Sequence, residues 1–372
     1  MKIDIIHATA GEGHRKIAVA VQEAFARSGH ADLDIRVIDA LDHVSPVFKA
    51  TYAPIYYWAV RHAPTLWGAS YDILDQRAIY NPLRPMRALT NSMHCGPLLK
   101  TVLDRRPDVV VSTHFLAPEL LGRAKRAGRL NARLITVISD YFPHTFWANP
   151  GTDHYWVMAE ETKAELVRRG IDPARVTAGG IPISAAFRPA GKRSEILKKH
   201  GFEDGRFTLL LTSGSFGLGP QEAILEELKA FQDKVQCFVV CARNEALRKR
   251  LDEKLFYFPV KVFGFVDFMP ELMEASDLMI AKSGGSTTTE ALAKNLCMVV
   301  MEPIPGQETR NAKLLKMRNA AFFLKKPGDI RDIMRGILSD PTVMVHKQRA
   351  IAGLSKPAAA DDLVYKILEG NI

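Results

Sequence analysis

The sequence predicts an α/β protein built from two doubly wound units that follow one another along the chain. Short runs of β-branched and other apolar residues alternate with longer segments of helical period, the pattern of parallel sheets whose strands are joined by helices. At 372 residues the chain is roughly twice the size of one domain, and its apolar fraction of 47% suffices for a core in each half.

The expected strands divide into two series. In the first half they are Lys2–His7, Leu33–Ile38, Asp108–Ser112, Arg133–Ile138 and Tyr155–Met158. In the second half they are Arg206–Thr212, Gln236–Cys241, Val260–Phe263, Leu278–Ala281 and Met298–Met301. Residues 179–191 are rich in Gly and Pro without clear periodicity, which indicates a linker. We therefore expect domains at 1–187 and 188–345, followed by a helical segment at 346–372 that packs back on the first domain.

Residues 46–100 show no strand pattern and are expected to form a helical insertion. The segment combines aromatic and basic residues: Tyr52, Tyr56, Tyr57, Trp58, Trp67, Tyr71 and Tyr80 with Lys49, Arg61, Arg77, Arg84 and Arg87. Aromatic residues at helical spacing usually belong to a core. Tyr and Trp interleaved with Arg and Lys also suit the headgroup boundary of an anionic bilayer. We interpret part of this segment as a membrane-docking surface.

The net charge of +9 and the pI near 9.3 indicate a partner that is anionic: nucleic acid, a bilayer or a phosphorylated substrate. No nucleic-acid-binding module is recognisable, so we expect no nucleic-acid partner. The four cysteines form no Cys-x-x-Cys pair, which fits a reducing cytoplasm and no zinc site.

The N-terminal apolar run is broken by Asp4 and His7, so it predicts a buried strand instead of a signal peptide. No run reaches the ~20 apolar residues that a spanning helix needs. We therefore expect a cytoplasmic protein that is peripherally associated with the inner face of the cell membrane.

Residues 278–290 suggest a phosphate site. A strand, Leu278–Ala281, is followed by a turn at Ser283-Gly284-Gly285 and by a helix from Thr287 onward. Free amides and the helix dipole at such a turn favour an anion. The alternative is a capping box, in which Thr287-x-x-Glu290 only closes the helix start.

Three further segments of the same half favour a nucleotide-sugar site. Thr212–Gly219 forms a second glycine turn between a strand and a helix. Gly264-Phe265-Val266, with Met269, offers a surface for a nucleobase, although Phe265 could equally belong to the core. Pro305–Asn311 places Gln307, Glu308 and Asn311 at a helix start, where their side chains could bind sugar hydroxyls.

Met269–Met273, Lys282–Gly285, Glu290–Leu292 and Pro305–Asn311 resemble the donor half of the monogalactosyldiacylglycerol synthase and processive diacylglycerol glycosyltransferase family, relatives of the peptidoglycan glycosyltransferase that makes lipid II. The resemblance implies a GT-B fold, in which two Rossmann-like domains face each other across a cleft, and a UDP-sugar donor. The donor residues it implies are Gly214, Ser215, Phe216, Asn244, Phe265, Val266, Met269, Ser283, Gly284, Gly285, Ser286, Thr287, Glu290, Gln307, Glu308 and Asn311.

The resemblance also implies roles within this set. Glu290 would hold the ribose, Phe265 and Val266 the uracil, and Gln307 with Glu308 the sugar. The diphosphate would lie at Gly214, Ser215 and Ser286. The family more often has Pro where Ser283 stands.

A histidine follows the first strand, in Ala8–Arg15. His14, on a glycine turn at a strand's carboxyl end, could take a proton from an acceptor hydroxyl, because its ordinary pKa near 6.5 suits that task. A lone histidine is more often a cap or a surface group. The turn Gly11-Glu12-Gly13-His14 resembles the family's Gly-Gly-Gly-His, with Glu12 in place of the middle glycine.

Ser139–Trp147 resembles the family's Thr-Asp-x-x-x-His-x-x-Trp stretch near the acceptor. Asp140 could orient or charge-stabilise His14, or itself be the base, and His144 and Trp147 would lie on the acceptor side. The alternative makes Asp140 a helix cap and Trp147 a core aromatic. Asp32-x-Asp34 is an Asp-x-Asp pair, which binds a divalent metal ion in other glycosyltransferases. Here the pair opens a strand, at the end that would lie away from the cleft, so we interpret it as structural.

We therefore predict an inverting glycosyltransferase that moves a hexose from a UDP-sugar to diacylglycerol or a glycosyl-diacylglycerol. No metal and no cofactor is required by this scheme. The alternatives are transfer of a UDP-GlcNAc type to a polyprenyl-linked acceptor, or a UDP-sugar 2-epimerase. The sequence leaves the sugar, the processivity and the oligomeric state open.

Overall fold

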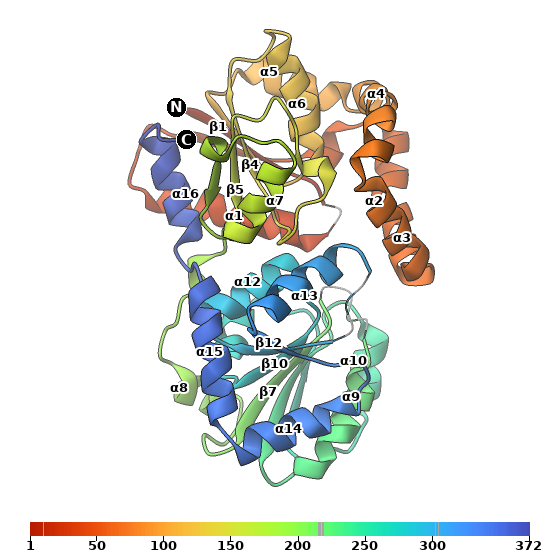
Figure 1. The fold of residues 1–372 in the computed structure, drawn as a ribbon. Helices are drawn as coiled ribbons and strands as arrows, with labels where there is room; N and C mark the ends of the chain where they lie inside the picture. The colour runs from red at the N-terminus through yellow and green to blue at the C-terminus, as the bar shows by residue number, and fades with distance from the viewer. Residues whose placement is uncertain (10, 215–216, 218, 302, 304) are drawn as a thin grey trace. The chain divides into compact units, whose positions relative to one another are not determined.

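A computed structural model of the chain describes residues 1–9, 11–214, 217, 219–301, 303 and 305–372. Two compact units are present (Figure 1). The first comprises Met1–Ala185, Ile304–Arg310 and Lys356–Ile372, and the second comprises Ala186–Pro303 and Asn311–Ser355. Each unit is a Rossmann-like domain with one parallel sheet of six strands, so the predicted α/β class is confirmed.

The sheet of the first unit has the strand order β2-β1-β3-β4-β5-β6. Its strands are β1 (Lys2–His7), β2 (Asp34–Asp39), β3 (Val109–Ser112), β4 (Arg133–Val137), β5 (His154–Val157) and β6 (Val176–Ala178). Every residue of β3 and β5 is buried, because helices cover both faces of a parallel sheet. The strand order reverses between β1 and β3, and the loops that follow these two strands therefore diverge.

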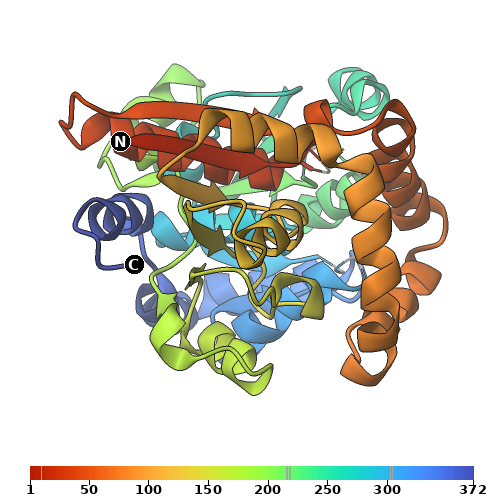
Figure 2. The same ribbon diagram turned by 90° about the horizontal axis from the view of Figure 1, so that it is seen from above.

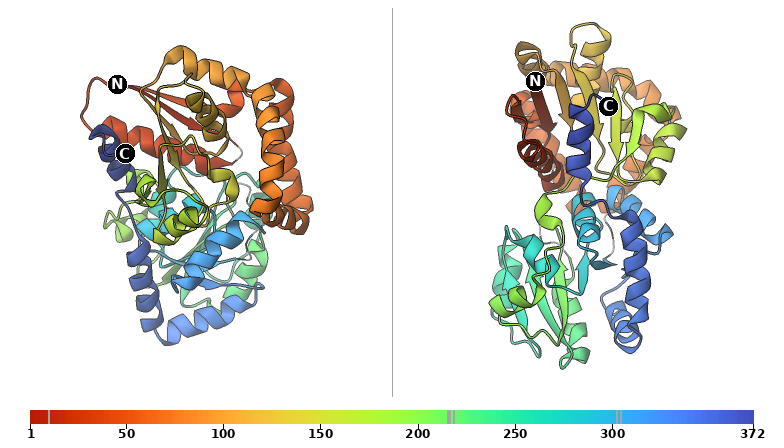
Figure 3. Two further views of the ribbon diagram at one scale, coloured as in Figure 1. Left: turned by 45° about the horizontal axis from the view of Figure 1, so that its top comes forward. Right: turned by 90° about the vertical axis from the view of Figure 1, so that its left-hand side faces the viewer.

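Helices of the first unit flank this sheet. They are α1 (Glu12–Arg27), α5 (Gly96–Arg105), α6 (Leu116–Arg126), α7 (Glu160–Arg168) and α16 (Ala359–Leu368), with the 3-10 turns η1 (Ala40–His43), η2 (Thr145–Trp147) and η3 (Pro173–Arg175). The C-terminal helix α16 packs beside α1 (Figure 3), where Arg27 pairs with Asp361 at 2.7 Å. The last residues of the chain thus belong to the first unit.

The segment that lacks a strand pattern forms helices α2 (Pro46–His62), α3 (Pro64–Leu74) and α4 (Arg77–His94). They lie on the side of the first unit that is remote from α16 (Figures 1 and 2). Two of the aromatic side chains expected at a membrane surface turn inward instead: Tyr80 is buried, and Tyr52 packs against the core. Trp58, in contrast, is 62% exposed.

The second unit has the strand order β12-β11-β10-β7-β8-β9, which reverses between β7 and β10. Its strands are β7 (Phe207–Thr212), β8 (Val235–Val240), β9 (Val260–Phe263), β10 (Leu278–Ala281), β11 (Cys297–Val300) and β12 (Ala321–Phe323). Its helices are α8 (Arg193–Lys199), α9 (Gln221–Leu228), α10 (Glu245–Asp252), α11 (Met269–Glu274), α12 (Gly285–Ala293), α14 (Asp329–Ser339) and α15 (Thr342–Leu354), with η5 (Lys229–Phe231). The turn η4 (Ala185–Phe187) joins the units in sequence, and α13 (Gln307–Met317) begins in the first unit and continues in the second.

The expected strands are all present, with ends that agree to within one residue. Two further strands, β6 and β12, were not expected. Each has three residues and pairs with a single neighbour at a sheet edge, so neither produces a periodic pattern long enough to recognise. The four cysteines are all buried, and none of them forms a disulfide.

The structure predicts that His154 in β5 makes stability depend on pH. Burial, and then the charges of Lys366 and Arg175, lower its pKa from 6.5 to about 4. The unfolded chain takes up this proton as the pH falls through 6.5, whereas the folded chain does so only near 4. The contribution of His154 to the free energy of unfolding is therefore complete above pH 6.5 and is lost between these values.

As the pH falls over this range, we expect the free energy of unfolding of His154→Gln to decrease by about 2–3 kcal/mol less than that of the parent protein. Urea denaturation at about pH 7 and about pH 4.5 measures it. Identical losses in the variant and the parent protein would contradict the assignment.

Candidate active site

The reversal point of the first sheet holds His14 in place. The imidazole Nδ1 lies 2.6 Å from the carbonyl oxygen of Thr113, the residue that follows β3. The Thr113 hydroxyl donates in turn to the main-chain carbonyl of His14 at 2.9 Å. The loop after β1 is tied to the end of β2, because the Asp39 carboxylate accepts the amide of Thr9 at 3.2 Å and also its hydroxyl.

We expected His14 in the glycine turn. It lies instead in the first turn of α1. The helix begins at Glu12, and Gly11 is its N-cap, so Gly13 and His14 are helical. A helical position gives the imidazole a more rigid attachment than a loop would.

The hydrogen bond to Thr113 defines the tautomer of His14. A carbonyl oxygen only accepts, so Nδ1 carries the proton and Nε2 keeps its lone pair. Burial lowers the pKa of His14 to about 4, although the bond to Thr113 acts in the opposite direction. The ring of His114 lies edge-on at 4.7 Å between centroids. At neutral pH His14 is therefore an uncharged base.

Asp140 is buried and is surrounded by hydrogen-bond donors. Its carboxylate accepts the indole N–H of Trp147 at 2.7 Å and the side-chain amide of Gln307, a residue of the first unit. Burial raises the pKa of Asp140, and these donors act against that rise. The helix-cap alternative for Asp140 is wrong, because His144 is the residue that caps η2.

No hydrogen bond joins Asp140 to His14 in the described residues, and Asp140 is not among the groups that shift the pKa of His14. Instead, Trp147 stands near both: its ring lies 6.2 Å from the imidazole, and its N–H reaches Asp140. Trp147 is thus a side chain that links Asp140 to the ring of His14.

Both ring nitrogens of His144 form hydrogen bonds with groups of the main chain. Nε2 donates to the carbonyl of Tyr71 at 2.9 Å, and Nδ1 accepts the amide of Phe146 at 3.2 Å. The side chain is 1% exposed, and burial lowers its pKa to about 4. These contacts favour a structural role for His144 over direct contact with an acceptor.

The glycine loop after β7 is braced from the next strand. Gly214 and Gly217 both have φ near the left-handed region, at 70° and 60°. A side chain at Gly217 would meet the Cys241 carbonyl at 2.2 Å, so only glycine fits there. Asn244, expected to contact the donor, caps α10 and donates to the Gly217 carbonyl at 3.0 Å. Ser215 and Phe216 lie outside the described residues.

The turn after β10 leads directly into α12. This helix begins at Gly285, two residues before the predicted start, with Gly284 as its N-cap. Thr287 therefore lies inside the helix, and the capping-box alternative is wrong. Since no side chain caps α12 and the space around Gly284 is open, the first amides of the helix can receive an anion.

Polar side chains support this turn. The carbonyl of Ser283 accepts the side-chain amide of Asn311, from α13, at 2.9 Å. Ser286 and Thr287 are partly exposed in the first turn of α12, and Glu290 lies one turn further on with 2% exposure. The glycine loop and this turn follow β7 and β10, so they flank the reversal point of the second sheet.

Phe265 follows β9 and is 61% exposed, so its interpretation as a core residue is wrong. The guanidinium of Arg243 lies 5.9 Å from its ring centroid. Val266 is half-buried, and Met269 begins α11.

Gln307 and Glu308 form the start of α13, as expected. Asp34 pairs with Arg105 at 2.7 Å, a structural contact.

Sequence reasoning missed Thr113 and Asp39, which hold His14 and its loop. Both stand at the carboxyl end of a strand, next to the first strand in the sheet. A search for polar residues directly after each expected strand would have found them. Within the described chain, no group of three His, Cys, Asp or Glu side chains is arranged to hold a metal ion.

Two family models match the chain. Residues 14–183 match monogalactosyldiacylglycerol (MGDG) synthase, and residues 208–329 match the glycosyltransferase family 28 C-terminal domain. The processive diacylglycerol beta-glucosyltransferase of Bacillus subtilis (strain 168) is 27% identical over 99% of this chain and 95% of its own length. The enzyme of the same name from Bacillus thuringiensis (strain Al Hakam) is 26% identical over 100% and 94%.

Over its whole length the chain is similar to the diacylglycerol glycosyltransferases. Among solved structures, Acinetobacter baumannii MurG is similar with a TM-score of 0.60, at 16% identity over 99% of both chains. The UDP-GlcNAc 2-epimerase from Neisseria meningitidis has a TM-score of 0.62, at 14% identity over 99% of this chain and 100% of its own. These likenesses confirm the GT-B fold. The segments that these family models match include His14, Asp140 and Glu290.

Two buried indoles permit a matched test of Asp140. Trp147 donates to the Asp140 carboxylate and Trp156 to the carbonyl of Gly180, each at 2.7 Å. We expect Trp147→Phe to lower the free energy of unfolding by about 1.5–3 kcal/mol, and Trp156→Phe by about 0.5–1.5 kcal/mol, because a bond to a charged group is stronger. Chemical denaturation near neutral pH measures both. Equal costs would indicate that Asp140 is uncharged.

Proposed function

We propose that this protein is an inverting glycosyltransferase that moves a hexose from a UDP-sugar to diacylglycerol or a glycosyl-diacylglycerol, forming membrane glycolipid. The observation that carries the proposal is His14, an uncharged histidine whose Nε2 lone pair is available at a sheet reversal point. Similarity to two processive diacylglycerol beta-glucosyltransferases supports the substrate class, because these enzymes are named for glucosyl transfer to diacylglycerol.

The donor half supports binding of a UDP-sugar. The uncapped amides of α12 and the loop at Gly214 would hold the diphosphate, together with Ser286 and the undescribed Ser215. Exposed Phe265 and neighbouring Val266 would receive the uracil, and Glu290 the ribose. Gln307 and Glu308 would bind the sugar.

The chemistry follows from the protonation state of His14. Nε2 takes the proton of the acceptor hydroxyl while that oxygen forms a bond to the anomeric carbon. The bond from this carbon to the UDP oxygen breaks on the opposite face, which inverts the configuration. UDP leaves with its charge stabilised by the α12 amides. This scheme requires neither a metal ion nor a cofactor.

Product analysis with a panel of UDP-sugars and diacylglycerol in anionic micelles tests the proposal. We expect a β-linked glycolipid and UDP. His14→Gln should lower kcat by about 10²–10⁴-fold while UDP affinity stays unchanged, because the donor half is intact. His154→Gln, a buried histidine of the same unit, is the control and should keep full activity. An epimerised UDP-sugar formed without acceptor would contradict the proposal, as would an active His14→Gln.

The pKa of His14 adds a pH signature to this assay. Because His14 stays unprotonated down to about pH 4, kcat/KM should not fall as the pH is lowered from 8 to about 5.

We also propose that helices α2–α4 bring the protein to an anionic bilayer, at the inner face of the cell membrane. No helix in the described chain is long and apolar enough to cross a bilayer. Most of the large apolar side chains that stay exposed in the described residues lie on these helices, including Ile55 (62%), Leu66 (70%) and Met93 (70%). An amphipathic surface of this kind inserts its apolar side chains beneath the headgroups.

Vesicle flotation tests this docking surface. Ile55→Ser or Leu66→Ser should each weaken binding to anionic vesicles about tenfold, since each removes an apolar side chain from the lipid. Leu255→Ser is the matched control, because Leu255 is 92% exposed but lies in the second unit. Equal losses in the control, or binding that ignores anionic lipid, would rule the surface out.

A further inference from the structure

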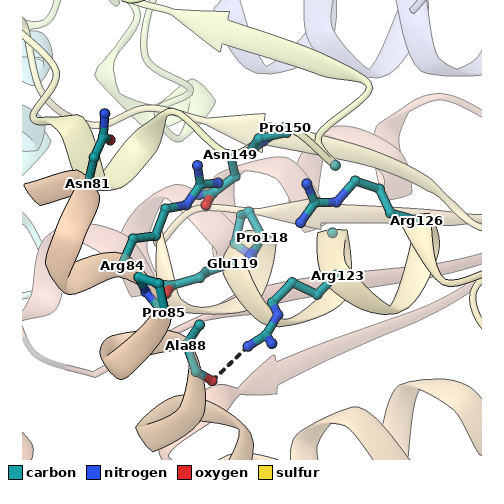
Figure 4. A pocket seen from close by; sticks show the side chains of 12 residues that line it. Asn81, Arg84, Pro85, Ala88, Pro118, Glu119, Arg123, Arg126, Asn149 and Pro150 are labelled. Atoms are coloured by element: carbon teal, nitrogen blue, oxygen red, sulfur yellow. Dashed lines mark hydrogen bonds between the residues drawn. The ribbon is translucent and has the colours of Figure 1, made fainter. Parts of the chain in front are cut away.

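A basic cavity in the first unit has no part in the reaction described above. It has a volume of about 250 Å³ and lies between α4, α6 and the loop at 149–151 (Figure 4). None of its lining residues was assigned to the donor or the acceptor. The cavity holds several times the ~30 Å³ that one water molecule occupies in the liquid.

Arginines dominate the lining. Arg84 from α4 and Arg126 from α6 extend into the cavity from opposite sides, and Arg123 reaches the carbonyl of Ala88 at 2.7 Å (Figure 4). In the described part of the chain, the side chains of Arg84 and Arg126 make no hydrogen bond and no ion pair. Other groups of the described chain therefore do not occupy the N–H donors of these two guanidinium groups, and the donors can bind an anion in the cavity.

The acidic side chain in the described lining does not neutralise these arginines. Glu119 pairs with Arg87 at 2.8 Å, and the two side chains are 5% and 20% exposed. The charge of Glu119 is therefore balanced by Arg87, and it does not offset the charges of Arg84, Arg123 and Arg126. The cavity keeps a net positive charge in a concave site, where like charges repel one another unless an anion binds between them.

The chemistry of the lining selects among anions. Planar guanidinium groups donate paired hydrogen bonds that match the oxygens of a phosphate. The side-chain amide of Asn81 adds a neutral donor to the lining. The backbone closes the site, since a side chain at Gly151 would meet the main chain of Gly122 at 2.3 Å.

We propose that this cavity is a phosphate-binding site, which takes the phosphate group of a soluble phosphate ester or of a lipid headgroup. Exposed Met86 and Leu89 lie on the same helix as Arg84 and would receive the chains of a lipid. The site does not depend on glycosyl transfer, so its test needs no turnover.

The test compares binding in three variants that each remove one positive charge. Arg84→Gln and Arg126→Gln change the cavity, whereas Arg129→Gln changes an exposed arginine outside it whose side chain has no hydrogen bond or ion pair in the described residues. Calorimetry with sn-glycerol 3-phosphate measures a soluble ester. Flotation with phosphatidylcholine vesicles, with and without phosphatidic acid, measures a headgroup. An unchanged unfolding midpoint shows that a variant is folded. If one of the two cavity variants does not fold, the other is sufficient for the test.

We expect saturable binding that weakens at least about tenfold in Arg84→Gln and Arg126→Gln and is unchanged in Arg129→Gln. If glycerol 3-phosphate shows this pattern, the ligand is a soluble ester; if only the vesicles show it, the ligand is a headgroup. Equal losses in all three variants would mean diffuse attraction and would overturn the proposal. Absence of phosphate-dependent binding in both assays would overturn it as well.

Discussion

The reversal of strand order in each parallel sheet is the constraint on which the site depends. The strand order reverses between β1 and β3, and again between β7 and β10, and in doubly wound sheets ligands generally bind at the carboxyl ends of the strands beside such a reversal. In the first unit the bond from His14 to Thr113 crosses this point. In the second, the Gly214 loop and the start of α12 stand there. Both halves of the proposed chemistry thus follow from topology, because the sheet leaves free amides and side chains only at these edges.

Burial acts in opposite directions on the two titratable groups of the first unit. It lowers the pKa of the His14 base and raises that of the Asp140 acid, because in each case the charged form loses hydration. The Asp140 carboxylate is instead supported by neutral donors from Trp147 and Gln307. His14 thus acquires its tautomer from a backbone carbonyl without help from a carboxylate. A carbonyl orients the ring without raising its pKa as strongly as a charge would, which keeps the base uncharged.

The insertion α2–α4 carries three different surfaces on a short stretch of chain. Tyr52 and Tyr80 pack inward, the large apolar side chains that stay exposed are mostly aliphatic, and Arg84 lines the cavity shared with α6. The composition indicated one basic and aromatic segment and did not distinguish these surfaces. Helical periodicity separates them, because residues three or four positions apart share a face while their neighbours point elsewhere. Exposed aliphatic residues such as Leu66 and Met93 therefore describe the docking surface better than the tyrosines do.

The sequence by itself determined the fold class, the longer strands, and the motifs around His14, Glu290 and Gln307, because apolar periodicity and glycine turns are local signals. Tertiary structure decided the rest. The edge strands β6 and β12 exist only through pairing with one neighbour. Asn244 braces the Gly217 carbonyl, a role that its sequence neighbours do not reveal. Thr113, which selects the tautomer of His14, lies 99 residues away along the chain. Contacts between distant segments leave no periodic trace in the sequence, so only the folded sheet shows which residue follows which neighbouring strand.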